Sequence, residues 1–194
     1  MMALRFVIVV GLCIFIGPGA SATDLLAIPS FPHFAEVNIT VSPGWIIRFR
    51  CNHDGQELIC RVDNLKNGKA ERFPEILVDS RNGRSERWKK GQWWLHASYN
   101  LCEGDGEFNV YNRDGVFQCA KQKPGWKANT FPLRQNEPME IRISLKKLNL
   151  VPGRRFGLAF DVTDTQSHWD FWPATARLDS PATWGLCELT PASR

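Results

Sequence analysis

Short apolar stretches alternate with polar residues along most of the chain, and turn-forming residues separate them. Each stretch is rich in β-branched and aromatic residues and ends near Gly, Pro, Asn or Asp, a pattern typical of strands. Beyond residue 22 no segment has the spacing of a long amphipathic helix. The eleven predicted strands are residues 35–41, 45–51, 57–62, 75–79, 92–99, 107–112, 116–120, 139–145, 156–162, 174–178 and 185–190. Strands of this length and spacing predict an all-β fold, an antiparallel two-sheet β-sandwich of jelly-roll type.

The region 138–190 has the clearest pattern. Residues 139–145 alternate between apolar and polar positions, and a single helical turn is predicted at 146–150. A Pro-Gly break separates this turn from the apolar strand 156–162. A polar loop with aromatic residues then leads to the closing strand. This order places aromatic rings at one edge of the predicted sandwich.

The first 22 residues have the features of a secretory signal peptide. One Arg precedes an apolar run at residues 6–16, a Gly-Pro-Gly break follows, and Ala20-Ser21-Ala22 supplies the small residues of a cleavage site. The apolar run is about half as long as a membrane-spanning helix requires. We therefore expect a secreted or periplasmic protein, with no membrane span after signal cleavage and a single domain at residues 23–194.

The charge balance argues against a nucleic-acid partner. The formal net charge is +4, and the basic residues occur in short, interrupted groups. Proteins that bind nucleic acids usually carry a continuous basic patch or stripe. The basic side chains are therefore expected on solvated surface.

Five of the six cysteines follow the signal segment. In an oxidising compartment we expect two disulfides, Cys51–Cys60 and Cys102–Cys119, each closing a hairpin. Such local pairing is the simplest of several connectivities, which the sequence does not determine. Cys187 is then left over, and we expect it to be a buried thiol on a strand.

The loop at residues 166–173 carries the main candidate binding residues. Trp169 and Trp172 lie there among polar groups. An indole ring packs on the apolar C–H face of a sugar, while the sugar hydroxyls need donors and acceptors. We expect at least one of the two rings to be a sugar platform, with His168 and Asp170 bonding hydroxyls; the alternative is that a ring packs back on the core. Trp126, in another loop, is a second platform candidate.

We expect no cofactor. The alternative is calcium, which takes clusters of oxygen ligands and for which three groups of Asp and Asn are candidates. The same residue types are common turn formers, and this is the interpretation we favour. The groups are Asp79 with Asn82, Asp63 with Asn64 and Asn67, and Asp161 with Asp164.

Five segments, in order, resemble the family 9 carbohydrate-binding module and its wider sugar-binding β-sandwich superfamily. They are Glu75-Ile-Leu-Val-Asp79, Trp93-Trp-Leu-His-Ala, Met139-Glu-Ile-Arg-Ile-Ser-Leu145, Phe156-Gly-Leu-Ala-Phe-Asp161-Val and Pro181-Ala-Thr-Trp184-Gly. The resemblance implies a small sugar held between aromatic rings, and calcium bound by acidic loops. Asp79 matches the acidic end of a strand, and Trp184 matches a closing-strand tryptophan that fills the end of the sandwich. Ser80 departs from the family, which often has Pro there, and the cysteine pattern is not a family feature.

These observations lead us to expect a non-catalytic carbohydrate-binding module that is associated with carbohydrate catabolism. The sequence has no Gly-x-Ser-x-Gly or His-Glu-x-x-His motif, so catalysis is not expected. Two alternatives remain: a protein-interaction scaffold that kept the fold without the sugar site, and a catalytic or accessory role in glycoside hydrolysis.

Overall fold

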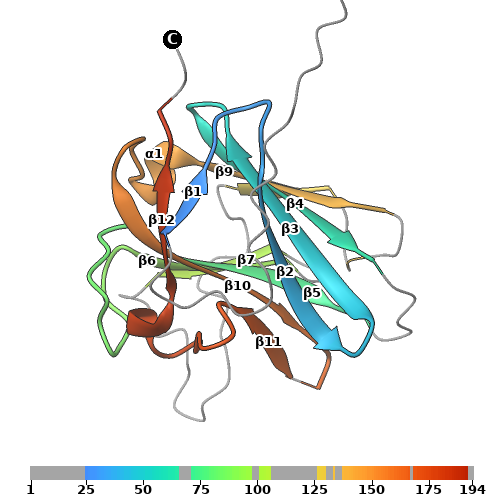
Figure 1. Cartoon of the computed structure of the whole chain (residues 1–194). Coiled ribbons are helices and arrows are strands. Elements are labelled where there is room, and N and C mark those ends of the chain that lie inside the picture. Colours follow the sequence, from blue (N-terminus) through green and yellow to red (C-terminus); the bar gives the residue numbers. More distant parts are fainter. Residues whose placement is uncertain are drawn as a thin grey trace, which may run out of the picture.

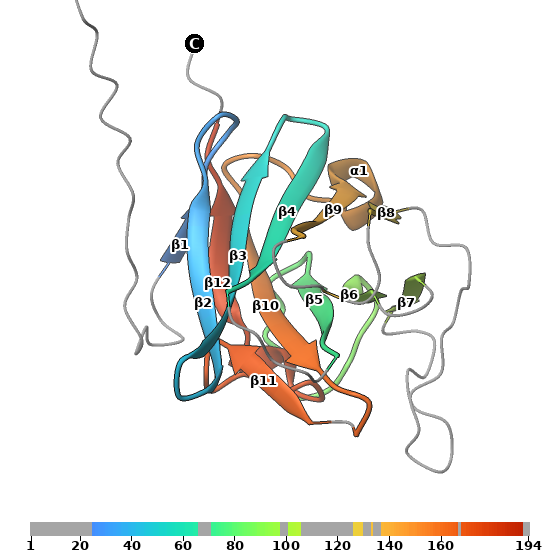
Figure 2. The same cartoon turned by 90° about the vertical axis from the view of Figure 1, so that its right-hand side faces the viewer.

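The computed structural model describes residues 25–65, 71–97, 101–105, 126–129, 133, 137–166 and 168–191 (Figure 1). For residues 102–105 only the backbone is described. Within these ranges the chain forms twelve strands, a four-residue α-helix and one 3-10 turn. The strands build two sheets that lie against each other (Figures 1 and 2), which confirms the predicted antiparallel β-sandwich. The helix in the described part is too short to cross a lipid bilayer.

The larger sheet has seven strands in the order β1-β12-β10-β5-β6-β7, with β11 added beside β10. Its strands are β1 (Leu25–Ile28), β5 (Phe73–Asp79), β6 (Gln92–Ala97), β7 (Leu101–Asp105), β10 (Arg155–Thr163), β11 (Trp169–Trp172) and β12 (Gly185–Leu189). The long strand β10 pairs with two partners in succession, because residues 155–158 pair with β12 and residues 160–163 pair with β11. Strand β11 is therefore an extra edge strand beside one half of β10.

The smaller sheet has five strands in the order β2-β3-β4-β9-β8. They are β2 (Ala35–Ser42), β3 (Trp45–His53), β4 (Glu57–Asn64), β8 (Trp126–Ala128) and β9 (Met139–Ser144). The turn between β3 and β4 is held by Asp54, whose Oδ1 accepts the backbone N–H groups of Gln56 and Glu57 at 2.9 and 2.7 Å. Gly55 takes φ 89° in this turn, a conformation that favours glycine. The turn fixes a register in which Cys51 lies opposite Cys60.

Most of the predicted strands are confirmed, with bounds shifted by a few residues. Two assignments in the closing region are wrong. Residues 174–178 form turns and no strand, and the predicted polar loop contains β11, because residues 169–172 pair with β10. The predicted helical turn is α1 (Leu145–Leu148), which the Ser144 hydroxyl caps. The predicted strands 107–112 and 116–120 lie outside the described residues.

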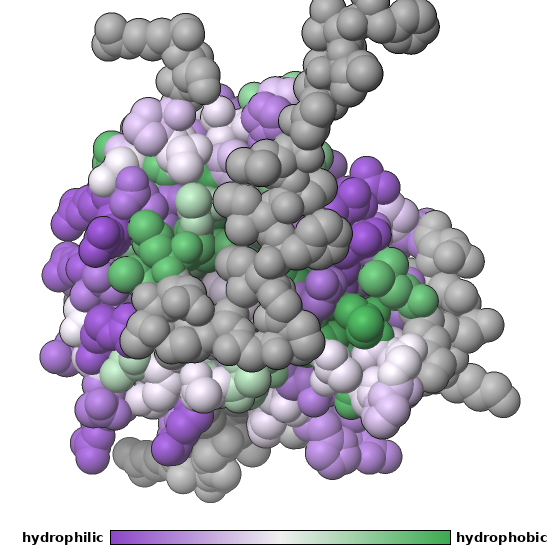
Figure 3. All heavy atoms as spheres, in the orientation of Figure 1, coloured by the Kyte–Doolittle hydropathy of each residue, from purple (hydrophilic) through white to green (hydrophobic). Residues whose placement is uncertain are grey.

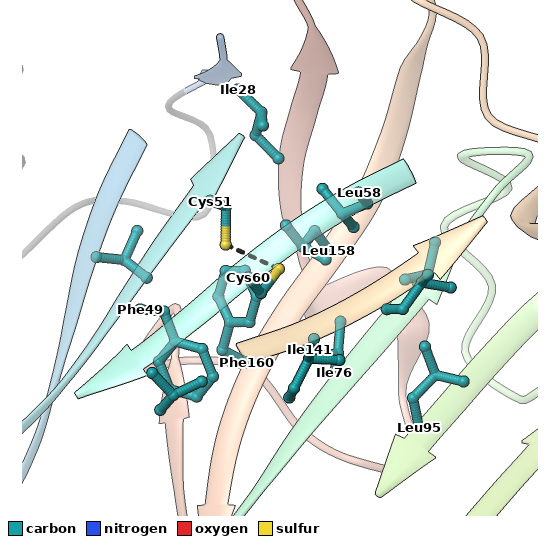
Figure 4. Close-up of a cluster of buried hydrophobic side chains, with 14 of the residues drawn as sticks. Ile28, Phe49, Cys51, Leu58, Cys60, Ile76, Leu95, Ile141, Leu158 and Phe160 are labelled. Atoms are coloured by element: carbon teal, nitrogen blue, oxygen red, sulfur yellow. Dashed lines mark hydrogen bonds between the residues drawn. The ribbon is translucent and has the colours of Figure 1, made fainter. Parts of the chain in front are cut away.

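The main core lies between the two sheets (Figure 4). Phe49 of the smaller sheet stacks on Phe160 of the larger one, with ring centroids 4.6 Å apart. Trp172 packs on the same Phe160 ring at 5.9 Å. Side chains alternate along a strand, so every second residue of β5, β6 and β10 enters this core.

A second, smaller apolar cluster covers part of the outer face of the larger sheet. Its centre is Trp184, which is fully buried and donates its indole N–H to the Arg177 carbonyl at 2.9 Å. Trp88 packs edge-on against Trp184 at 5.2 Å. The prediction that Trp184 is architectural is confirmed. The segments 80–91 and 173–184 thus cover the rows of the sheet around Leu77 and Trp94.

Candidate functional site

The outer face of the larger sheet carries polar residues in the middle of apolar strands. The register sets them in rows across neighbouring strands. One row is apolar and lies under Trp184: Trp94, Leu77 and Ala159. The next row consists of His96 on β6, Glu75 on β5, Asp161 on β10 and Phe171 on β11. The last row ends in Phe73, Thr163 and Trp169. We call the row His96, Glu75 and Asp161 the polar row.

Glu75 is the organising residue of the polar row. It is 2 % exposed, and its Oε2 accepts the indole N–H of Trp94 at 2.8 Å. Its other oxygen forms a short contact with Nδ1 of His96, whose ring also stacks on Trp94 with centroids 5.3 Å apart. The carboxylate thereby fixes the orientation of the imidazole and leaves Nε2 as its second polar atom.

Asp161 lies beside Glu75 and is fully buried. Neither of its carboxylate oxygens has a hydrogen-bond partner among the described residues. Burial, together with the charges on Glu75 and Asp170, raises its pKa well above the usual value. Two adjacent buried carboxylates cannot both carry a full charge cheaply, which is the physical reason for the raised pKa of Asp161.

Trp169 supplies an exposed aromatic ring next to the polar row. The residue is 38 % exposed and pairs with Thr163, one position along β10 from the row of Asp161. All eight tryptophans lie in the described residues, and Trp169 is the most exposed of them. Phe171, half-buried, continues the same face of β11 toward Trp94. Of the two rings considered for this segment, Trp169 is therefore the exposed one.

A charged cluster at the end of the sheet holds the segment before β11. Asp164 accepts the backbone N–H groups of Gln166 and His168 at 2.8 and 3.0 Å, and its Oδ2 lies 3.1 Å from Nδ1 of His168. Arg72, almost buried, lies 3.6 Å from Asp164 and 3.7 Å from Asp170. The guanidinium also covers the Trp45 ring at 5.0 Å. We call these residues the Arg72 cluster.

The two acids of the Arg72 cluster have opposite pKa shifts. Although burial acts to raise it, the pKa of Asp164 is lowered, because His168 and Gln166 donate hydrogen bonds and Arg72 adds positive charge. Burial raises the pKa of Asp170, and the charge of Asp164 adds to this effect while Arg72 opposes it. Asp164 is thus the fixed anion that orders the loop.

The predicted ligand-binding residues do not all meet at one place. His168 is highly exposed at the start of β11, whereas Asp170 points to the opposite face of that strand from Trp169. Trp172 is 8 % exposed and Trp126 is 3 % exposed, and both rings belong to the main core. The expectation of an open ring is therefore not met at these two positions. Alternation along β11 explains why Trp172 is buried, because Trp172 faces inward when Trp169 and Phe171 face outward.

The candidate calcium ligands have structural roles. Asp79 Oδ1 and Oδ2 accept the backbone N–H groups of Arg81 and Arg84 at 3.2 and 3.1 Å, so the carboxylate shapes the turn after β5. Asn82 has φ 49° in this turn. Asp63 lies within 2.7 to 3.8 Å of three arginines on β3 and β4. Asn67 of the same predicted group lies outside the described residues. No group of three or more His, Cys, Asp or Glu within the described ranges is placed to hold a metal ion.

The cysteines are placed only in part. Cys51 and Cys60 are buried thiols whose sulfur atoms lie 3.0 Å apart, so the predicted bridge is not closed in this structure. Cys187 is fully buried on β12, as expected. Cys119 lies outside the described residues, and the predicted Cys102–Cys119 pair lies outside them too.

The sequence did not single out Glu75, His96 or Arg72 as site residues. Each lies within or directly before a predicted apolar strand, where a lone polar residue gives no sign of its partner. The available signal was the charge itself, since Glu75 and Asp161 interrupt runs of buried apolar residues. Their meeting depends on the β5–β10 register, which the sequence pattern does not give.

Comparison with known proteins adds to this geometry. No protein-family model and no curated protein matches the sequence. Similar solved structures include a family 9 carbohydrate-binding module from Caldicellulosiruptor kristjanssonii in complex with cellotriose, with TM-score 0.59 and 14 % identity over 88 % of this chain and 95 % of that chain. A structure of such a module from the same organism in complex with glucose gives TM-score 0.52 and 16 % identity over 86 % of this chain and 84 % of that one. The chain therefore has a β-sandwich fold like that of family 9 carbohydrate-binding modules.

Proposed function

We propose that the protein binds a small carbohydrate on the outer face of its larger sheet, at the polar row beside Trp169. The fold is like that of modules whose structures hold cellotriose and glucose. At this identity the likeness supports the fold alone, so the proposal depends on the chemistry of the face.

The observation that carries the proposal is the polar row itself, which lies next to the one exposed indole. Burying Glu75 and Asp161 costs free energy that an apolar pair would not cost. Groups of this kind are concentrated at functional sites, where they set the charge and orientation of the groups at the surface. Here Glu75 holds His96 in place, and the side chain of His96 remains 16 % exposed.

The two parts of the site match the two surfaces of a sugar. The exposed Trp169 ring can stack on the C–H face of a pyranose, and His96 can exchange hydrogen bonds with hydroxyl groups. His168, highly exposed next to Trp169 in sequence, is the further polar contact we propose. A shallow site of this composition is expected to bind with Kd in the micromolar to millimolar range, about 4–8 kcal/mol.

The test is isothermal titration of the purified chain with glucose, cellotriose and a panel of other oligosaccharides. Trp169→Ala should weaken binding about 10-fold or more, since one stacked ring contributes on the order of 1 kcal/mol beyond its buried area. Trp169→Phe should retain part of the affinity. The matched control is Phe31→Ala, which removes another exposed ring, 67 % exposed, from the loop after β1.

The outcomes separate the function from the site. If the wild-type chain binds no member of the panel, carbohydrate binding is wrong, and the scaffold alternative gains support. If the wild type binds and Trp169→Ala binds equally well, the sugar site lies elsewhere on the molecule.

A further inference from the structure

Three cysteines from both sheets lie in the main core. Cys51 on β3 and Cys60 on β4 point toward one another in Figure 4, and Cys187 comes from β12 of the larger sheet. All three are at most 1 % exposed. This cluster plays no part in the proposed carbohydrate site, and the inference below does not depend on that site.

The geometry of Cys51 and Cys60 is close to that of a disulfide. The two residues are direct cross-strand partners, which places their Cα atoms about 4.5–5.5 Å apart. Disulfides span Cα distances of about 4.4–6.8 Å and have a bond of about 2.0 Å. Since the sulfur atoms are 3.0 Å apart, closure needs about 1 Å of sulfur movement and no change of register.

Cys187 adds a third sulfur to the same place. Burial raises the pKa of the Cys187 thiol, and the nearby Cys60 adds to the effect. Burial likewise raises the pKa of Cys51, with further contributions from Cys60 and then Cys187. A buried neutral thiol is a poor nucleophile, so exchange between the three sulfurs is slow once the core has formed.

We propose that Cys51 and Cys60 form a disulfide that closes the β3–β4 hairpin, and that Cys187 stays a thiol beside it. The bond forms before the core closes, when both thiols are accessible. The thiolate of one cysteine attacks a disulfide oxidant, either a protein or a small-molecule disulfide, and forms a mixed disulfide. The second thiolate then displaces the oxidant. Two thiol protons are lost, the two electrons reduce the oxidant to its dithiol form, and one S–S bond is made.

The choice of partner follows from strand geometry. Cys51 and Cys60 are 9 residues apart in sequence and opposite one another in register, because the Asp54 turn brings them together as soon as the hairpin forms. A bond from either one to Cys187 must wait until the two sheets pack. The local pair is therefore oxidised first.

The direct experiment uses the full chain, exported to an oxidising compartment and purified without reductant. The protein is denatured in the presence of an alkylating agent, digested and mapped by mass spectrometry. The proposal predicts a Cys51–Cys60 linked peptide and an alkylated Cys187. Alkylation of both Cys51 and Cys60, or a peptide linked through Cys187, would overturn it.

A second experiment measures thermal unfolding with and without dithiothreitol. Reduction should lower the Tm of the wild type by about 5–10 °C more than that of Cys51→Ala/Cys60→Ala, because the hairpin bridge restricts the unfolded chain. Cys187→Ala is the matched control and should respond as the wild type does. A bridge that involves none of these three cysteines responds in all three proteins, so it does not affect the comparison. An equal response in the wild type and the double variant contradicts the proposal, and the peptide map decides if that variant does not fold.

Discussion

The two faces of the seven-stranded sheet are built from alternating residues of the same strands, yet they differ in chemistry. On the inner face Ile76 and Phe160 pack against the other sheet. The residues next to them in sequence, Glu75 and Asp161, place two carboxylates on the outer face. The inner face stabilises the folded state by apolar burial, whereas the buried carboxylates of the outer face reduce that stability. Because buried charge lowers stability, we infer that the outer face meets a requirement other than stability.

The largest effect is expected from the inner face. Phe160→Ala removes a fully buried ring that stacks on Phe49 at 4.6 Å and contacts Trp172. The lost contacts and the cavity should lower the free energy of unfolding by about 3–5 kcal/mol. Chemical denaturation measures this, with the exposed Phe31→Ala as control, which should stay within about 0.5 kcal/mol of the wild type. A loss below about 1 kcal/mol at Phe160 would show that the two layers do not pack as described.

A smaller loss is expected from the polar row. Glu75→Ala leaves the Trp94 indole N–H and the His96 ring without their shared partner. One buried donor left unpaired costs about 1–3 kcal/mol, so we expect a loss of about 2–3 kcal/mol in a urea titration.

Glu75→Gln is the matched variant, because its amide oxygen still accepts from Trp94. It should lose about half as much as Glu75→Ala or less. If the two variants are equally stable, the hydrogen bond from Trp94 to residue 75 contributes nothing to the free energy of unfolding.

The inner face could be predicted from the sequence, and the outer face could not. Period-2 patterns such as residues 139–145 report which residues face a core, and this is enough to assign strands and a sandwich. The same patterns fail where a segment pairs at an edge. Residues 169–172 contain too many polar neighbours to suggest a strand, but β10 is longer than β12 and offers them free hydrogen-bonding groups.

The candidate site shows the same division. An exposed Trp169 follows from a polar aromatic segment, but the sequence does not tell which indole of the segment faces out. That choice depends on the β10–β11 register, which turns Trp172 to the core. The polar row depends on the β5–β6 and β5–β10 registers, whose paired residues in this row are about 20 and 85 residues apart in sequence. Long-range pairing of this kind leaves no local pattern to recognise.

The smallest effect is expected from Asp161→Asn, because this variant and the wild type should be almost equally stable at acid pH. The sign of their stability difference at higher pH tests the polar row. Burial raises the folded-state pKa of Asp161 above its unfolded value, so the folded protein holds this proton more tightly than the unfolded chain does. The stabilising contribution is fully present below the ordinary carboxyl pKa and is lost as the pH rises through the raised folded-state pKa. An Asn side chain has nearly the same shape, keeps an N–H donor next to Glu75 and cannot ionise.

The wild type and Asp161→Asn should therefore be almost equally stable at acid pH, and the variant should become the more stable protein as the pH rises. Paired urea titrations from acid to alkaline pH measure this difference, in which the titration of all other groups cancels. A wild type that is as stable as the variant at high pH would mean that Asp161 ionises without cost. The charge on the outer face would then need no functional explanation.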